Sequence, residues 1–284
     1  MNRPADHTTS RVPEFRNARL DFSSVGSRDW HPRLPEFACA VEAVSLLMPH
    51  AEPYVVNSAE RVIDGLDPDL RTMTTGYIRQ ERQHHVQHRR FNRAVIGDRR
   101  GLGLLDRAMA AVFAALGRRS AAFGVAFAAG FETIAFAGAR WTEPRIGSLF
   151  RGAADEPTRL FLWHLAEEVE HKGVAFDVWR TVDGNRFRYA FATIVAALVL
   201  AVFSFVGTLC LLWGRRRLFS PLAHGRLLVW SISFVFDAVT AIVLSCLPGH
   251  HPDDFADPTY LLDWLGADGD RDSAAISTAP TSVR

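Results

Sequence analysis

Apolar and polar residues recur with helical spacing along most of the first two thirds of the chain. The turn Leu66-Asp67-Pro68-Asp69 precedes a polar helical segment rich in Arg, Gln and His, and Asp183-Gly184 ends the last segment. The pattern predicts an all-α fold that begins with a four-helix bundle. The predicted helical segments lie within residues 35–64, 70–95, 104–140 and 156–182.

Two prolines interrupt the first of these segments. Pro49 and Pro53 lie inside an otherwise helical pattern. A proline within a helix removes a backbone hydrogen bond and clashes with the preceding turn. We therefore expect this helix to be kinked or split in two.

Two long apolar runs follow the bundle. Residues 190–213 carry no charge and have arginines on both sides, and residues 227–247 are interrupted only by Asp237. Their length and flanks predict a hydrophobic helical hairpin that could cross a membrane, with the arginine-rich loop 214–226 in the cytoplasm. The alternative is a pair of buried or interfacial helices that pack on the bundle or on the second subunit of a homodimer.

These features divide the chain into four parts. A polar N-terminal tail, 1–30, shows no apolar segment of a cleaved signal peptide. The bundle follows at 31–185, the hydrophobic helix pair at 186–250, and a short helix with a disordered tail at 251–284. We expect a membrane-associated protein with the bundle in the cytoplasm, although a cytoplasmic loop 214–226 would place the bundle on the other side.

The overall charge gives no reason to expect a nucleic-acid partner. The chain has 32 Lys and Arg against 31 Asp and Glu, a net charge of +1. Proteins that bind nucleic acids usually carry a clear basic excess.

Two Glu-x-x-His motifs point to a metal site. On a helix, residues three positions apart lie on one face with their Cβ atoms about 5–6 Å apart. Glu81 with His84, and Glu168 with His171, can therefore each bind one metal ion. A solvated Glu/His surface without metal is the alternative.

A dinuclear site in a four-helix bundle also takes one Glu from each of two further helices. Glu132 lies in an apolar segment, where an unpaired carboxylate would be costly, and it precedes the second motif by about one helix, a loop and half a helix. For the first half of the bundle the candidates are Glu52 and Glu42. The chain thus resembles a duplicated helix pair.

Further polar residues share the faces of the two motifs. His88 and His164 would project toward one end of the site, as metal ligands or as hydrogen-bonding neighbours that could transfer protons. Glu167 could orient the histidine of the other motif helix through its ring N–H, or it could be solvated. Tyr77 could be a redox-active phenol or only a packing residue.

On these motifs the chain resembles the bacterial family described as predicted metal-dependent hydrolases, over roughly residues 30–265. The resemblance implies a ferritin-like fold and favours Glu52 over Glu42 as ligand. The chain departs from the family pattern at Pro53, which could place Glu52 at a helix start. The matching segments are Ser45-Leu46-Leu47-Met48-Pro49, Gln80-Glu81 with His84, His88 and Asn92, Phe131-Glu132-Thr133, and Trp163-His164 with Glu167-Glu168, Glu170-His171-Lys172 and Asp177.

Carboxylates with two histidines suit two iron ions, with manganese or zinc as alternatives. The ligand set favours an oxidoreductase that oxidises a small apolar or lipid-like substrate with dioxygen. The family description favours a hydrolase in which two metals activate a water molecule. A non-catalytic metal-binding membrane protein is the third possibility.

Overall fold

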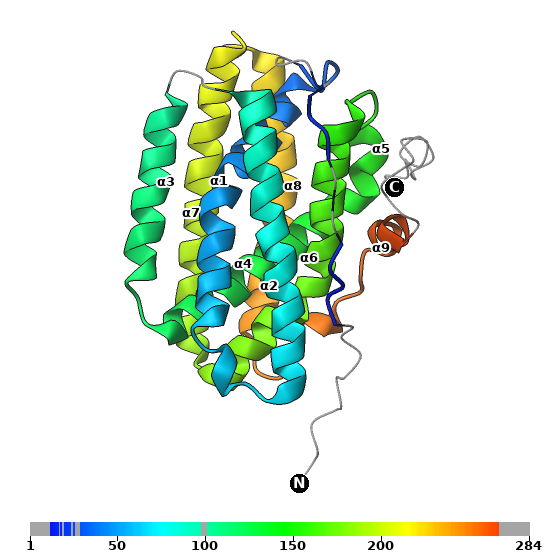
Figure 1. Ribbon diagram of the computed structural model, residues 1–284. Coiled ribbons are helices and arrows are strands. Elements are labelled where there is room, and N and C mark those ends of the chain that lie inside the picture. Colours follow the sequence, from blue (N-terminus) through cyan, green and yellow to red (C-terminus); the bar gives the residue numbers. More distant parts are fainter. Residues whose placement is uncertain are drawn as a thin grey trace.

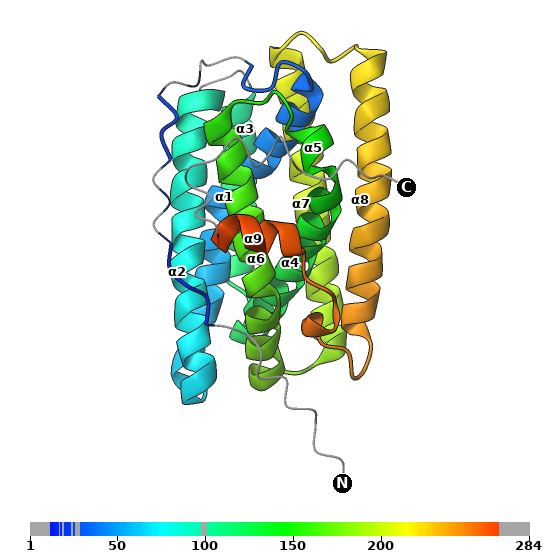
Figure 2. The same cartoon turned by 90° about the vertical axis from the view of Figure 1, so that its right-hand side faces the viewer.

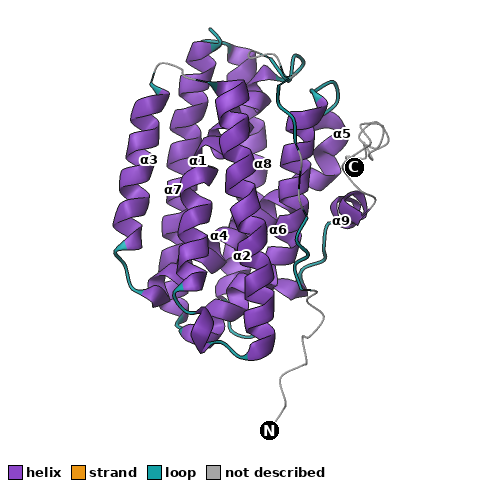
Figure 3. Ribbon diagram, in the orientation of Figure 1, coloured by secondary structure: helices purple, strands orange, loops and turns teal. Residues whose placement is uncertain are grey.

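The computed structural model describes residues 12–16, 18, 20–23, 25, 29–97 and 101–266. Throughout these residues the chain forms helices and loops and no strand (Figure 3). The predicted all-α fold is therefore confirmed. The disordered tail predicted after residue 266 lies outside the described residues.

Four long helices enclose a common interior (Figure 1). Helix α1 packs against α2 and α4, and α6 packs against the same two helices. The four therefore form a closed ring, and their inward faces meet along the axis. A likeness to ferritin stays a prediction. The helices are α1 (Pro35–Glu60), α2 (Pro68–Phe91), α4 (Ala121–Thr142) and α6 (Asp155–Val182).

Helix α1 runs without a break through Pro49 and Pro53. Of the two outcomes expected from the prolines, the split was therefore wrong, and the kink stays a prediction. A proline inside a helix costs about 3 kcal/mol. The buried side chains of Leu47, Ala51 and Val55 alternate with the prolines along the packed part of the helix, and their burial offsets part of that cost.

Side-chain caps fix the starts of two site helices. The carboxylate of Asp67 accepts hydrogen bonds from the backbone N–H groups of Asp69 and Leu70 at the start of α2. The side chain of Ser120 accepts a hydrogen bond from the backbone N–H of Phe123 and starts α4. The predicted helical segment 104–140 therefore forms two helices, with α3 (Leu102–Gly117) before α4. Helix α2 continues into a π-helical turn, Asn92–Ile96.

The two hydrophobic helices pack against the bundle. Helix α7 (Arg186–Gly214) lies along α1 and α4, and α8 (Pro221–Cys246) lies mainly along α4 (Figures 1 and 2). A Cβ atom added at Gly130 of α4 would lie 2.8 Å from the Cα atom of Thr193 on α7. The buried residues Tyr189 and Ala192 belong to the same core as the bundle. The boundary predicted at residue 186 therefore does not separate two cores.

Within the part of the chain that the structure describes, three helical stretches are long and apolar enough to cross a membrane: Ala121–Leu149, which contains α4, and the helices α7 and α8. They differ in how deeply they are buried. In the most apolar window of each, 78% of residues are buried in the first stretch, 28% in α7 and 11% in α8. The apolar residues of α4 therefore pack inside the bundle, whereas most of the residues of α8 face outward.

The described N-terminal residues contact both α2 and α6. Leu20, Phe22 and Trp30 are buried, which differs from the polar tail expected from the sequence. The composition of this region does not reveal these few apolar residues, because polar residues surround them in the sequence. Two short helices, α5 (Ile146–Leu149) and α9 (Thr259–Gly266), complete the fold, and α9 packs across α6 (Figure 2).

Candidate metal centre

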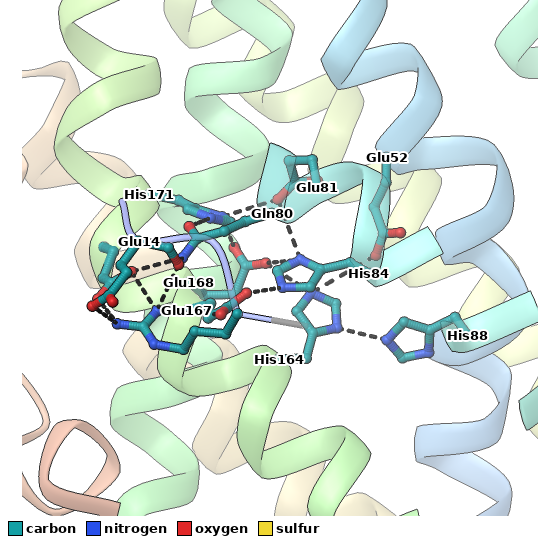
Figure 4. Close-up of polar contacts among 12 residues, drawn as sticks. Glu14, Glu52, Gln80, Glu81, His84, His88, His164, Glu167, Glu168 and His171 are labelled. Carbon is teal, nitrogen blue, oxygen red and sulfur yellow. Dashed lines mark hydrogen bonds and ion pairs between the residues drawn. The ribbon is translucent and has the colours of Figure 1, made fainter. Parts of the chain in front are cut away.

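Carboxylates and imidazoles from α1, α2 and α6 meet in the interior (Figure 4), and Glu132 joins them from α4. The glutamates and the two motif histidines among them are almost completely buried, each residue being at most 3% exposed. The structure brings together the six residues that the sequence analysis names as metal ligands. They are Glu52 on α1, Glu81 and His84 on α2, Glu132 on α4, and Glu168 and His171 on α6.

The two Glu-x-x-His motifs face each other across the interior. Glu81, His84, Glu168 and His171 each offer one ligand atom, and these atoms all lie within 4.8 Å of one another. Nδ1 of His171 lies 2.9 Å from Oε1 of Glu81 and 3.6 Å from Oε2 of Glu168. Nδ1 of His84 lies 3.4 Å from Glu81 and 3.5 Å from Glu168. This buried group could hold a metal ion.

Glu132 joins this group from α4. Its Oε2 lies 3.7 Å from Nδ1 of His171, and its Oε1 accepts a hydrogen bond of 2.7 Å from the hydroxyl of Tyr77. Burial, the negative charges of Glu132 and Glu81, and the hydrogen bond raise the pKa of Tyr77 well above its usual value. The phenol therefore keeps its proton and holds the Glu132 carboxylate in place.

A second group lies at the other end of the site. Glu52, His88 and His164 offer ligand atoms within 4.8 Å of one another. Nε2 of His88 lies 2.6 Å from Nδ1 of His164, and Nε2 of His164 lies 2.7 Å from Oε1 of Glu168. The histidines thus connect the second group to the first. Burial and the neighbouring histidines lower the pKa of both rings, which favours the neutral form that binds metals.

The inward-facing atoms of the six residues lack hydrogen-bond partners. They are buried, and even the closest pairs are not aligned as hydrogen bonds. A buried polar atom without a partner costs about 1–3 kcal/mol, and more when it is charged. A divalent cation would satisfy several of these atoms at once. The atoms are both Oε atoms of Glu52, Oε1 of Glu81, Nδ1 of His84, Oε2 of Glu132, Oε2 of Glu168 and Nδ1 of His171.

Two of the carboxyl groups have raised pKa values when no metal ion balances the negative charge of the cluster. Burial raises the pKa of Glu52 and of Glu132 well above the usual value, and the negative charges of Glu81 and Glu168 raise it further. Carboxylates that share a site cannot all ionise at low cost. A bound cation would replace these protons.

The two motif histidines carry raised pKa values. Burial disfavours the charged ring of His84, but the hydrogen bond to Glu167 and the negative charges of Glu81 and Glu167 outweigh burial and raise its pKa to about 10. The pKa of His171 is raised well above its usual value against the same effect of burial, by Glu168 and Glu81. Metal binding to either ring therefore displaces a proton.

The outer ring nitrogen of each motif histidine is held by the opposite helix. Nε2 of His84 donates to Oε2 of Glu167 at 3.0 Å, and Nε2 of His171 donates to Oε1 of Gln80 at 2.7 Å (Figure 4). A fixed proton at Nε2 leaves Nδ1 free to bind a metal in the interior. Glu167, which the sequence analysis names as a residue that could orient the histidine of the other motif helix, thus lies outside the group of four and contacts His84.

The sequence analysis names Gln80 among the segments that match the family but assigns it no role. It stands directly before Glu81, as Glu167 stands directly before Glu168. Each of these two residues contacts the histidine of the other motif. The repeated position before the motif glutamate was the signal that could have identified Gln80.

Glu42 and Glu52 have different places in α1. Glu42 forms two hydrogen bonds with the guanidinium group of Arg215, of 2.5 and 2.8 Å, and accepts a third from the indole of Trp30. Its oxygen atoms are therefore satisfied away from the interior. Glu52 lies mid-helix at the site despite Pro53, with Oε1 at 3.7 Å from Nε2 of His164.

A comparison with protein families gives one match. The model of a family described as predicted metal-dependent hydrolase matches residues 14–255. No curated protein and no solved structure matches the chain. The match covers all the helices that form the site.

Proposed function

The chain belongs to the family of predicted metal-dependent hydrolases, and on this basis we propose that its Glu/His cluster is the dinuclear metal centre of an enzyme. The observation that carries the proposal is the convergence of unpartnered carboxylate and imidazole atoms from four helices. Four carboxylates with two histidines, arranged as Glu-x-x-His on two helices and a single Glu on each of two more, are the ligand set of di-iron and di-manganese helix bundles.

The ligand set favours oxidation of a small apolar or lipid-like substrate by dioxygen at two iron ions. Hard carboxylate ligands suit iron or manganese better than metals that prefer thiolates. When bound, two iron ions would pass two electrons to dioxygen, and the two-electron oxidation of the substrate would return them. Tyr77 would hold Glu132, and His88 with His164 would carry protons between the second group and Glu168.

Hydrolysis is the second candidate, and the family description favours it. Two metal ions would lower the pKa of a water molecule and stabilise the negative charge that forms on an ester, amide or phosphoester. The neutral His88 and His164 pair could then accept a proton from the attacking water. A metal-holding protein without catalysis is the remaining alternative.

One experiment separates these functions. The protein would be purified without oxygen from iron-supplemented cells, and its metal content and optical spectrum measured before and after exposure to air. We expect about two iron ions per chain, with ferric absorption that appears in air. The Glu168→Ala variant should show neither.

Other outcomes would redirect or contradict the proposal. Bound zinc or manganese, no response to air, and hydrolysis of aryl esters or phosphoesters that Glu168→Ala abolishes would identify the hydrolase. Bound metal with neither response would favour metal holding. Absence of metal after reconstitution with iron, manganese and zinc would contradict all three functions.

We also propose that the outer face of α7 and α8 contacts a lipid bilayer. Large apolar side chains are exposed along both helices, for example Phe205 at 65% and Phe236 at 76%. Such continuous apolar surfaces on soluble monomers are uncommon. At the loop between the helices, exposed Trp213 and Phe219 stand beside exposed Arg216 and Arg217. Aromatic and basic residues together are typical of contact with anionic lipid headgroups, which favours a bilayer over a second copy.

This contact would lie along the membrane surface and not cross it. Helices α7 and α2 both run along the long axis of the molecule (Figures 1 and 2), and α7 packs on α1 and α4. Crossing would carry α2 into the hydrocarbon, where each arginine costs about 2.5–3.5 kcal/mol or more. The exposed arginines of α2 are Arg71, Arg79, Arg82, Arg89 and Arg90.

Flotation with vesicles that contain anionic lipid tests the membrane contact. The protein should float with the vesicles, and Phe236→Asp should weaken this binding. Val86→Asp, which changes an exposed apolar residue on α2, should not. A monomeric protein that does not float with the vesicles would contradict the proposal. A dimer that Phe236→Asp separates would assign this face to a second copy instead.

A further inference from the structure

The N-terminal segment, defined by the described residues between 12 and 25, places one arginine beside the candidate metal centre. Nη1 and Nη2 of Arg16 bind the two carboxylate oxygens of Glu170 at 2.9 and 2.8 Å. Nη1 also lies 3.2 Å from Oε1 of Glu167. Arg16 thus joins two carboxylates of α6 that point away from the interior. Glu167 is fully buried, so its negative charge needs a partner.

Both carboxylates lead to a motif histidine. Glu167 accepts the hydrogen bond of Nε2 of His84. Glu170 accepts a hydrogen bond of 2.8 Å from Nε2 of Gln80, whose Oε1 accepts the hydrogen bond of His171. The guanidinium group of Arg16 is therefore connected to both rings. The connection to His84 runs through the carboxylate of Glu167, and the connection to His171 runs through the carboxylate of Glu170 and the amide of Gln80.

The surface of α2 is shaped to receive this segment. A Cβ atom added at Gly76 would lie 2.6 Å from the carbonyl oxygen of Pro13, so only glycine allows the segment to approach so closely. One turn later, Gln80 donates to the carbonyl oxygen of Glu14 at 2.9 Å (Figure 4). Further along, Arg90 donates to the carbonyl oxygen of Leu20 at 2.9 Å. The segment is therefore held along α2 on both sides of Arg16.

We propose that the N-terminal segment, through Arg16, is a positioning device that fixes the orientation of both motif histidines and so sets the metal affinity of the site. This inference rests on the proposed metal-binding function. Hydrogen-bond partners behind a metal-binding histidine fix the ring and its tautomer, and their loss typically lowers metal affinity by about 10- to 100-fold. Arg16 acts on two histidines at once, although it belongs to no helix of the bundle.

The test measures the affinity of the full chain for Zn²⁺ by competition with a chromophoric chelator. Arg16→Ala should lower the affinity by about tenfold or more. Arg16→Lys should recover part of it, since lysine keeps the charge but loses the two-pronged geometry. Arg33→Ala is the matched control and should not change the affinity, because among the described residues this exposed guanidinium group hydrogen-bonds to the carbonyl oxygen of Arg151, far from the site in the sequence.

A background that already carries Glu167→Ala and Gln80→Ala separates the effect of Arg16 on the orientation of the two histidines from its effect on the stability of the fold. If Arg16 acts through the two hydrogen-bonded partners, Arg16→Ala should have little further effect in a chain that already carries Glu167→Ala and Gln80→Ala. Gly76→Ala provides a second route, because it displaces the segment while Arg16 remains and alanine favours helix α2. It should also lower the affinity, and it replaces Arg16→Ala if that variant does not fold.

The outcomes are distinguishable. Wild-type protein that binds neither Zn²⁺ nor, on reconstitution, iron or manganese contradicts the proposed function; if it binds only iron or manganese, the variants are compared by their content of that metal. Wild-type protein that binds Zn²⁺ with the same affinity as folded Arg16→Ala and Gly76→Ala contradicts only the positioning role. An equal loss from Arg16→Ala in the presence and absence of the Glu167 and Gln80 substitutions also contradicts it, since Arg16 would then act by another route.

Discussion

The carboxylate of Glu167 lies 3.0 Å from Nε2 of His84, on the neighbouring helix. The reverse contact joins Gln80 to His171, also across the two helices. Helices α2 and α6 therefore each provide a Glu-x-x-His motif and a residue that orients the histidine of the other. The two motifs are mutually dependent, and the site has an approximate two-fold arrangement.

The raised pKa of His84 predicts that metal affinity increases with pH. In the metal-free protein this ring keeps both of its protons, and so its positive charge, up to about pH 10. A metal that binds Nδ1 must displace one of them. Each displaced proton raises the affinity about tenfold per pH unit. Chelator competition at three pH values between about 6.5 and 8.5 would measure the slope. An affinity that does not change over this range would contradict the assignment of His84 as a ligand.

The same group predicts the opposite trend for the stability of the metal-free protein. The folded pKa of His84, about 10, lies above the usual 6.5. The stability that its charged form contributes is therefore complete below pH 6.5 and is lost as the pH rises toward 10. Urea unfolding of the metal-free protein should show a decreasing free energy of unfolding over this window, and His84→Gln should flatten the decrease. An unchanged slope in that variant would refute the prediction.

The ion pair of Glu42 with Arg215 predicts a loss of stability without a loss of metal. Both side chains are at most 6% exposed. Removal of one partner from a buried pair typically costs about 3–5 kcal/mol. Glu42→Gln should therefore lower the urea midpoint and leave the metal content unchanged, whereas Glu52→Gln should reduce metal binding. A loss of metal from Glu42→Gln alone would restore Glu42 as the ligand.

The close approach of α4 and α7 predicts that Gly130→Ala is destabilising. The new Cβ atom would lie 2.8 Å from the Cα atom of Thr193, so one helix must move. Overpacking of this kind typically costs about 1–3 kcal/mol. The control is Gly225→Ala in α8, where a Cβ atom has no neighbour within 4 Å. Alanine should be neutral or stabilising there by about 0.5–1 kcal/mol. Equal thermal unfolding midpoints for the two variants would indicate that α7 does not pack on α4.

Local patterns were sufficient to predict the all-α fold and the shared helix face of each Glu-x-x-His motif. The three-residue spacing of Glu81 with His84 forces both side chains onto one face of a helix, and the second motif repeats it. The caps at Asp67 and Ser120 act within three residues. These are properties of a single helix, and they can be deduced from the sequence.

Contacts between distant segments were not predictable in this way. Arg16 and Glu167 are 151 positions apart, and nothing near either residue indicates the other. The continuity of α1 through Pro53 depends on burial of its neighbours, which a local pattern does not show. An apolar run such as 190–213 fits a bilayer and a protein core equally well, because both environments reward the same side chains.

The metal content of the purified protein tests the central claim most directly. Wild-type protein and the Glu168→Gln and Glu42→Gln variants would be reconstituted with iron, desalted and analysed by elemental mass spectrometry. The structure predicts bound metal in wild type and Glu42→Gln and its loss from Glu168→Gln. Equal metal in all three proteins, or none in wild type, would contradict a metal centre at this Glu/His cluster.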